Sequence, residues 1–317
     1  MGRYLLARLV LLVPVLIGVS LVTFSLIRLV PGDPVAVVLG AETQATPEQV
    51  AAIRTAFGLD EPAPLQYLHW IGRVVSGDLG TSFRTGRSLR QELALRLPVT
   101  LELSLLAAVL GMVPAVLAGT LAALRRNSPT DYVVAVGTLA GLSFPNFLLA
   151  TLLVLLFSVV LRWLPPLGYV ELNVNPIGNL RTMLLPAICL ALPFAGVMMR
   201  ITRSSVLEVL GQDYVRAARS KGLRPATILR RHVLPNAAIP LITVAGLSLA
   251  RLLGGAVIVE TIFGLPGIGR YVFEAISTRD YPVVQSVTLV VAVAFVLVGL
   301  LVDVLYALVD PRLRTSH

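Results

Sequence analysis

Residues 214–235 read YVRAARSKGLRPATILRRHVLP, a basic segment inside a chain that is otherwise strongly apolar. Residues with high helix propensity run from about Val206 to Lys221, and Gly222 suits the left-handed position that ends a helix. Pro225 suits the first turn of a following helix. The segment therefore predicts a helix, a sharp turn at Gly222 and a second helix.

The composition around this segment indicates the class of protein. Hydrophobic residues make up 56% and charged residues 14% of the 317 residues, whereas soluble domains contain about 25% charged residues. This balance predicts a polytopic membrane protein. The net charge of +9 fits the basic loops that orient such a protein in its membrane. No nucleic-acid-binding module is recognisable, so a nucleic-acid partner is not expected.

Six stretches are long and apolar enough to cross a bilayer as helices, which takes roughly 17 to 25 residues. They cover residues 9–27, 103–124, 132–161, 182–199, 233–250 and 282–302, and the fifth continues through Arg251 to about Val259. The first is longer than the apolar core of a secretory signal and lacks a following cleavage site, so a membrane helix is expected there. The predicted fold class is all-α, with six transmembrane helices.

The distribution of basic residues predicts how these helices are oriented. Fourteen basic residues flank one side of the six spans, and eight of them lie between Arg200 and His232 beside only two acidic residues. Because basic loops stay in the cytoplasm, the N- and C-termini and residues 200–235 are expected on that side. The long connection 31–98 then lies outside. Apolar residues at helical spacing between Leu65 and Val75 predict short helices packed on the outer membrane face.

The sequence offers few groups for catalysis or metal binding. Its three histidines lie in different regions, and its single cysteine, Cys189, lies in an apolar run, so no catalytic set, metal site or cofactor site is predicted. The single lysine, Lys221, does not stand in a GxxxxGK[ST] loop, so this chain is not expected to bind ATP in that way. The GLPGIG segment from Gly264 lacks that lysine too and is expected to form a re-entrant or outer loop.

One arginine lies inside a predicted span. Nine residues separate Arg251 from Glu260 near the outer end of the span, which places them on roughly opposite faces of a helix. At membrane depth Arg251 needs either a water-filled path or an acidic partner on another helix or subunit. Gly254 and Gly255 indicate either close helix packing or a kink. We group Arg251, Gly254 and Gly255 as a candidate translocation path.

The basic segment resembles the cytoplasmic signature of binding-protein-dependent ABC importer permeases, in which EAA is followed by three residues, Gly, nine residues and I-x-L-P. Here Ala217 and Ala218 precede Gly222 by that spacing, and HVLP ending at Pro235 takes the place of I-x-L-P. Arg216 stands where the signature has Glu, so the role of that Glu is not carried over.

Six further segments are similar to the B-type subunit of the dipeptide, oligopeptide and nickel permeases, in the same order along nearly the whole chain. They are PGDP from Pro31, GLDEPAPLQYLHW from Gly58, GDLGTSF from Gly77, LLGGAVIVETIFGLPGIG from Leu252, RDYPVVQ from Arg279 and DPRLR from Asp310. The resemblance implies a type I ABC importer permease fold in a bacterial cytoplasmic (inner) membrane. Its parts would be a first transmembrane helix over 1–30, an extracytoplasmic helical segment over 31–98 and a core permease domain over 99–317.

The resemblance also implies partners and a cargo. The partners would be a second, C-type permease subunit, two cytoplasmic ATPase subunits that hydrolyse ATP, and an extracytoplasmic solute-binding protein. The coupling loop 200–235 would contact the ATPases through Tyr214, Arg216, Ala217, Ala218, Lys221, Gly222, Leu223 and Pro235. The implied cargo is a di- or oligopeptide, with nickel chelates, glutathione and oligosaccharides as alternatives. Outside the family, the alternatives are an ion-coupled secondary transporter and a membrane-embedded enzyme.

Overall fold

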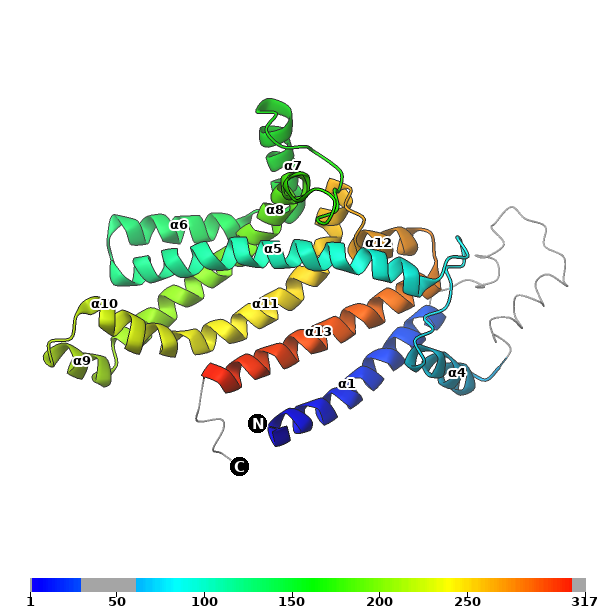
Figure 1. Cartoon of the computed structure of the whole chain (residues 1–317), viewed down its shortest axis with the longest axis horizontal. Coiled ribbons are helices and arrows are strands. Elements are labelled where there is room, and N and C mark those ends of the chain that lie inside the picture. Colours follow the sequence, from blue (N-terminus) through cyan, green and yellow to red (C-terminus); the bar gives the residue numbers. More distant parts are fainter. Residues whose placement is uncertain (1, 30–60, 310–317) are drawn as a thin grey trace.

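The computed structural model describes residues 2–29 and 61–309, and this part of the chain is mostly helical. The long helices form an elongated bundle (Figure 1). In chain order the helices are α1 (Gly2–Leu29), α4 (Ala63–Val75), α5 (Leu89–Leu124), α6 (Pro129–Ser143), α7 (Asn146–Leu153), the π-helical turns η1 (Val154–Val160), α8 (Pro176–Leu210), α9 (Asp213–Ser220), α10 (Pro225–Ile228), the π-helical turn η2 (Leu229–Val233), α11 (Leu234–Phe263), α12 (Ile268–Ser277) and α13 (Tyr281–Val309). The predicted all-α fold is confirmed for the described residues.

Four of the six predicted spans coincide with membrane-spanning candidates of the described structure. By length and composition, four helical segments of the described chain could each cross a membrane, and each of two bent helix pairs would add one more. The four segments are Leu89–Leu124, Pro176–Leu210, Pro225–Leu252 and Tyr281–Val304. The first predicted span corresponds to α1, which has 28 residues.

The third predicted span, 132–161, is not one continuous helix. The segments Pro129–Ser143 and Asn146–Val160 meet at an angle of 104°, and α7 stands out from the bundle (Figure 1). The backbone is extended at Phe144, because the following Pro145 disfavours the helical conformation of the residue before it and offers no N–H to the helix. The prediction missed this break because the apolar run continues through it.

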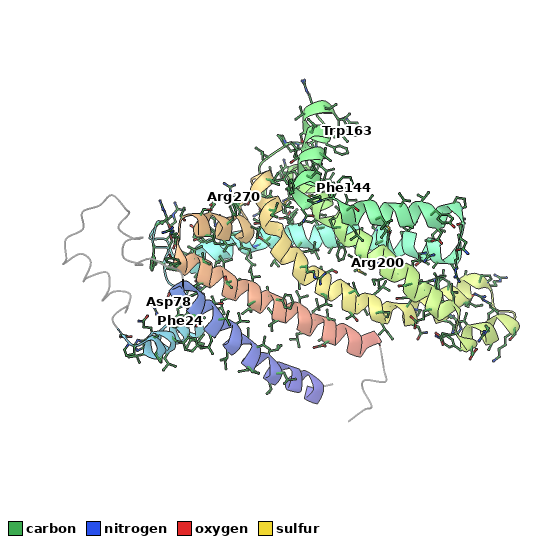
Figure 2. The ribbon with its side chains drawn as sticks, turned by 180° about the vertical axis from the view of Figure 1, so that it is seen from behind. Phe24, Asp78, Phe144, Trp163, Arg200 and Arg270 are labelled. Atoms are coloured by element: carbon green, nitrogen blue, oxygen red, sulfur yellow. The ribbon has the colours of Figure 1, made fainter. Side chains whose placement is uncertain are left out.

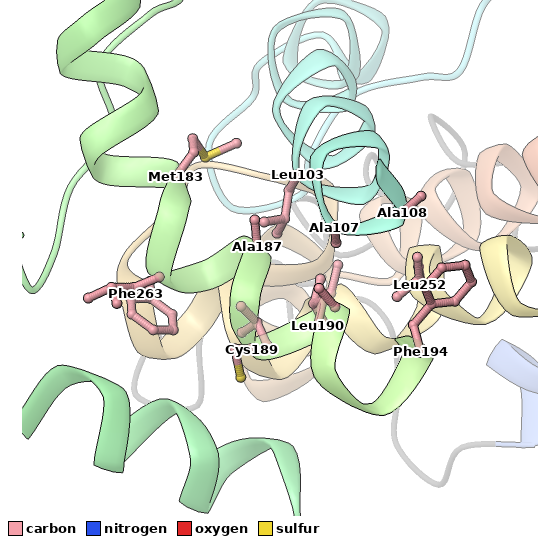
Figure 3. Close-up of a cluster of buried hydrophobic side chains, with 14 of the residues drawn as sticks. Leu103, Ala107, Ala108, Met183, Ala187, Cys189, Leu190, Phe194, Leu252 and Phe263 are labelled. Atoms are coloured by element: carbon pink, nitrogen blue, oxygen red, sulfur yellow. The ribbon is translucent and has the colours of Figure 1, made fainter. Parts of the chain in front are cut away.

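Small residues bring α5 and α8 into close contact. Ala107, Gly111, Ala115 and Gly119 recur every four residues and form one face of α5. A Cβ atom on Gly111 would lie 2.5 Å from the Phe194 ring, and one on Gly119 would lie 2.7 Å from a backbone oxygen of α8. Such stripes allow helix backbones to approach each other in a membrane. Side chains of α5, α8 and α11 fill the core beside this contact (Figure 3).

The bundle has two distinct ends. Figure 1 shows α9 and α10 at one end, called here the α9 end, and α4 and α12 at the other, called the α12 end. The first turn of α1 and the last turn of α13 point toward the α9 end (Figure 1). Helix α4 confirms the predicted helix around Leu65 to Val75, whereas residues 31–60 of the predicted extracytoplasmic segment lie outside the described residues.

Aromatic residues attach α4 to α1. The ring of Phe24 in α1 lies 5.3 Å from the ring of Tyr67 and 5.9 Å from that of Trp70, both in α4. The Tyr67 hydroxyl also shares a hydrogen bond of 2.8 Å with the Ser20 hydroxyl. Figure 2 labels Phe24 and Asp78, the latter following α4 in the chain, at the same end of the bundle. The contact fixes α4 at the α12 end, beside the helix that carries the N-terminal span.

Candidate functional site

The segment that opens the sequence analysis forms a compact helical corner at the α9 end. The predicted helix from Val206 to Lys221 is interrupted, because α8 ends at Leu210 and α9 begins only at Asp213. Gly211 closes α8, and Gln212 has an extended backbone. This break was missed because the residues on both sides favour helices. The predicted turn and second helix are present, since α10 begins at Pro225.

Gly222 has the left-handed conformation that the sequence predicts, with φ of 74°. Its N–H donates to the Arg219 carbonyl at 2.9 Å, and the N–H of Leu223 donates back to the Ala218 carbonyl at 3.3 Å. This bond spans six residues, as in the Schellman motif that ends many helices at a glycine. The turn satisfies carbonyls at the end of α9 and aims the chain into α10.

The predicted coupling residues fall into an exposed group and one buried member. The exposed residues are Tyr214, Arg216, Ala217, Lys221, Gly222, Leu223 and Pro235. Ala218 is buried, with 7% of its surface accessible. Ala218 therefore packs inside this chain, whereas the sequence interpretation had given it an outward-facing role beside Ala217.

An apolar cluster behind the exposed group connects the corner to the long helices. Its buried members from the corner are Val215, Ala218, Ile228 and Val233. They pack with three residues of the bundle: Ala123 of α5, Val206 of α8 and Ala237 of α11. We call this set the corner cluster. A force applied to α9 would reach three long helices through these contacts.

A partly buried ion pair lies near the same end. Arg203 of α8 donates to Asp131 of α6 through two nitrogens, Nε to Oδ1 at 2.5 Å and Nη2 to Oδ2 at 2.7 Å. The backbone N–H of Asn127 donates to the same carboxylate at 3.0 Å. In the sequence analysis Arg203 counted only as one of the basic residues that predict the cytoplasmic side. The ion pair could not be predicted, because its partner lies 72 residues away. The pair fixes the start of α6 against α8.

The α12 end contains a fully buried carboxylate. Glu260 of α11 has 0% of its surface exposed. Its carboxylate accepts hydrogen bonds from the Thr100 hydroxyl at 2.6 Å and from the backbone N–H of Arg270 at 2.9 Å. The Thr100 oxygen in turn accepts from the N–H of Ile268 at 2.9 Å. Glu260 thus binds the start of α12 and joins it to α5.

The glycine-rich GLPGIG segment is shaped by this carboxylate. Between Ala256–Phe263 and Ile268–Ser277 the chain bends by 86°, which fits the predicted re-entrant or outer loop. Gly264 makes the turn with φ of 67°. A Cβ atom on Gly267 would occupy the position of the Glu260 carboxyl group, and one on Gly269 would lie 2.9 Å from its Oε2 atom. The glycines therefore make room for Glu260 rather than for a phosphate.

Two other segments singled out in the sequence contact each other at this end. Ser82, in GDLGTSF, donates its hydroxyl to the Asp280 carboxylate at 2.5 Å, and the Phe83 N–H donates to the same carboxylate at 3.1 Å. Asp280 belongs to RDYPVVQ, which joins α12 to α13. The hydroxyl of Ser286 donates to the Leu79 carbonyl at 3.2 Å. These bonds attach the loop before α5 to the start of α13.

Glu102 of α5 has a hydrogen-bond partner in the loop before α8. The hydroxyl of Tyr169 donates to its Oε2 atom at 2.9 Å. Burial, together with the bond to this carboxylate, raises the pKa of Tyr169 to about 12. The phenol therefore stays protonated at neutral pH and remains a hydrogen-bond donor. The loop that carries Tyr169 also contacts α11, because the Gly168 N–H donates to the Phe263 carbonyl at 3.1 Å.

The candidate translocation residues lie in the middle of α11. Arg251 and Gly254 are exposed. Glu260 is buried on another face, as the helix geometry predicted. The surroundings of Gly255 are outside the described part of the structure. Among the described residues, no group of three or more His, Cys, Asp or Glu side chains could hold a metal ion.

Family models match most of the sequence. A model described as "Binding-protein-dependent transport system inner membrane component" matches residues 115–315. A second model, described as "Binding-prot-dependent transport system membrane comp, N-term", matches residues 1–104. Together the two matches include the corner at α9 and the buried carboxylate at α12.

Curated relatives are similar along their whole length. The chain is 42% identical to a probable peptide ABC transporter permease of Sinorhizobium fredii, over 99% of this chain and 100% of that protein. It is 44% identical to a di/tripeptide transport system permease of Pseudomonas aeruginosa, over 99% of each chain. It is 40% identical to a dipeptide transport system permease of Escherichia coli, again over 99% of each chain.

Solved structures share the fold at lower sequence identity. The MetNI methionine ABC transporter in an inward-facing conformation matches with a TM-score of 0.56 and 18% identity, over 69% of this chain and 96% of that chain. An amino acid ABC transporter matches with a TM-score of 0.51 and 18% identity, over 68% of this chain and 92% of that chain. At this identity the likeness concerns the fold of the helical bundle.

Proposed function

The chain belongs to the family of binding-protein-dependent transport system inner membrane components, and from this membership we propose that it carries di- or oligopeptides through a bacterial ATP-driven importer. It is a multi-pass inner-membrane permease subunit, and ATP hydrolysis belongs to separate subunits of such a transporter. The observation that carries the peptide assignment is the similarity, over 99% of the chain, to permeases named for peptides and dipeptides.

The proposed assembly has four further components. A second, C-type permease subunit would complete the translocation path, two ATPases would bind on the cytoplasmic side, and a solute-binding protein would deliver cargo from outside. The α9 end, with its exposed basic residues, would face the cytoplasm, because positively charged connections stay on that side. The α12 end and the segment 31–98 would then face outward and receive the binding protein.

The corner formed by α9 and α10 is the proposed contact with the ATPases. Its outer surface presents Arg216, Lys221 and Leu223, while Val215 and Ala218 pack inward on the corner cluster. A rigid corner of this kind can fill a cleft on a partner and pass its movement to α5, α8 and α11. Gly222 sets the angle between the two short helices.

The test of the peptide assignment uses the complete transporter with its own binding protein in proteoliposomes. We expect ATP-dependent accumulation of labelled di- or oligopeptides, and we expect mass spectrometry to find a peptide retained by the purified binding protein. An ATPase variant that cannot hydrolyse ATP serves as the control. Accumulation of a nickel chelate, glutathione or an oligosaccharide, with no uptake of any peptide, would reject the assignment.

The test of the ATPase contact uses a photo-crosslinking residue placed at Leu223, which is 40% exposed at the corner. We expect a crosslink to an ATPase subunit in the intact transporter. The matched control is Leu68 on α4, which is 60% exposed at the opposite end of the bundle. Equal crosslinking from both positions, or none from Leu223, would place the ATPases elsewhere.

A further inference from the structure

Helix α11 leaves one narrow stripe uncovered in the middle of the bundle. The exposed positions are spaced alternately by four and three residues, as on one face of a helix. They are Leu247, Arg251, Gly254, Ile258 and Thr261. Another face of α11 lies in the core through Leu252, Ala256, Val259 and Phe263. The stripe is therefore the surface of α11 that remains for a molecule outside this subunit.

Arg251 lies near the centre of this stripe without an anionic partner. Among the described residues, no carboxylate lies within ion-pair distance of its guanidinium. Two other charged side chains of the bundle do have partners within the chain: Arg203 pairs with Asp131, and Glu260 accepts a hydrogen bond from Thr100. A charge at membrane depth is retained where it meets water or an opposite charge, and is disfavoured against lipid. Arg251 therefore needs water or an anion that comes from outside the chain.

The surroundings of Arg251 fit a small anionic group attached to a variable body. Gly254 lies almost one turn further along the stripe, and a Cβ atom there would meet nothing within 4 Å. Packing against this chain therefore does not require a glycine at that position, and its small size leaves space beside the guanidinium. Leu247 and Ile258, which are 54% and 49% exposed, offer apolar surface on either side.

We propose that Arg251 binds the C-terminal carboxylate of a peptide in transit. The inference rests on the proposed function, because it takes the cargo to be a peptide. The planar guanidinium matches a carboxylate through two parallel N–H donors. The free carboxylate is the anionic group that all unmodified peptides share, whereas their side chains differ. Arg251, with free space at Gly254 and apolar surface on either side, would therefore select peptides by their shared carboxylate and tolerate different side chains.

The experiment compares a dipeptide with its C-terminal amide, using the complete transporter in proteoliposomes. Both compounds are supplied at concentrations that saturate the external binding protein, so that delivery does not limit uptake. The variants are Arg251→Gln, which removes the charge, and Arg251→Lys, which keeps a charge without the planar fork. The matched control is Arg181→Gln, which changes another exposed arginine near the start of α8.

We expect the wild-type transporter to move the free acid faster than the amide by on the order of tenfold, the effect of one charge-assisted hydrogen bond. Arg251→Gln should lower uptake of the free acid until the ratio of the two rates approaches one. Arg251→Lys should retain part of the preference, and Arg181→Gln should retain all of it.

Two results would overturn the carboxylate site while leaving the peptide assignment intact. One is an unchanged preference for the free acid in Arg251→Gln. The other is an equal loss of uptake for both compounds together with a lower yield of the complex, which would assign Arg251 to an acidic residue of a partner subunit. A wild-type transporter that imports neither peptide but imports a different cargo would instead refute the proposed function, and the carboxylate site with it.

Discussion

Replacing Gly222 with valine tests whether the corner at α9 transmits movement. The backbone at Gly222 is left-handed, with φ of 74°, and a Cβ atom there would meet nothing within 4 Å. The cost is therefore backbone strain alone, about 1 to 3 kcal/mol for a β-branched residue. That range corresponds to a reduction of roughly 5- to 150-fold in the population of the native turn relative to a relaxed one.

The consequence should be loss of coupling with retention of the fold. The strained position lies outside the membrane-spanning helices, and the corner cluster behind it keeps all its side chains. We expect Gly222→Val to reach the membrane at the normal level, and to lower ATPase retention or peptide-stimulated ATP hydrolysis together with uptake. ATPase retention, peptide-stimulated ATP hydrolysis and uptake are all measured on one reconstituted complex, so that a loss of assembly is separated from a loss of transmission.

Two matched variants isolate the backbone effect. Gly222→Asn keeps a residue that tolerates the left-handed conformation, and it should preserve more coupling than valine does. Gly211→Val adds the same side chain to another exposed glycine of the coupling loop 200–235, at an ordinary φ of −80°, and should have little effect. Normal uptake and normal ATPase association in Gly222→Val would refute the view that this turn aims the corner at the ATPases.

Three further predictions concern topology, energy supply and the buried carboxylate. Cysteines introduced at Arg216 and Ser76, which lie at opposite ends of the bundle and are exposed, should be labelled from opposite sides of the membrane; labelling from one side would refute the proposed orientation. The purified chain alone should not hydrolyse ATP, since its single lysine lies outside any phosphate loop, and turnover by a contaminant-free sample would contradict this. Glu260→Gln should lower the free energy of unfolding of the complex by about 1 to 3 kcal/mol, because the amide nitrogen cannot accept a bond from the buried groups that the carboxylate now satisfies. Glu274→Gln, at an exposed pair with Arg270, is its control and should have little effect.

Local patterns predicted the local features well. The position of Gly222, the start of α10 at Pro225 and the helix α4 follow from residues that are neighbours in the sequence, and backbone preferences act at that range. The broken third span shows the limit of the method. Hydropathy alone continued through Phe144 and Pro145, although the proline itself carried the signal for a break.

Long-range contacts explain what the sequence could not predict. Glu260 and Thr100 are 160 residues apart, and Asp280 and Ser82 are 198 residues apart. Each residue by itself is an ordinary polar side chain. Only the folded bundle determines which of these groups meet, and so only the structure shows that Glu260 holds the start of α12. The missing lysine already argues against a phosphate loop at GLPGIG.

The same long helices are held at both ends of the bundle, and this arrangement bears on how movement crosses the membrane. Near the α12 end, Thr100 of α5 donates to Glu260 of α11. Near the α9 end, Ala123 of α5 and Ala237 of α11 both belong to the corner cluster. On each helix the two contact residues are 23 positions apart. This is about 35 Å along a helix, slightly more than the roughly 30 Å thickness of the hydrocarbon core. Because α5 and α11 are fixed together near the α12 end and packed through one cluster at the α9 end, we infer that a push on the corner tilts them together. The start of α12 would then move with the corner, which in the proposed orientation would give bound ATPases a mechanical route to the outer end of the bundle.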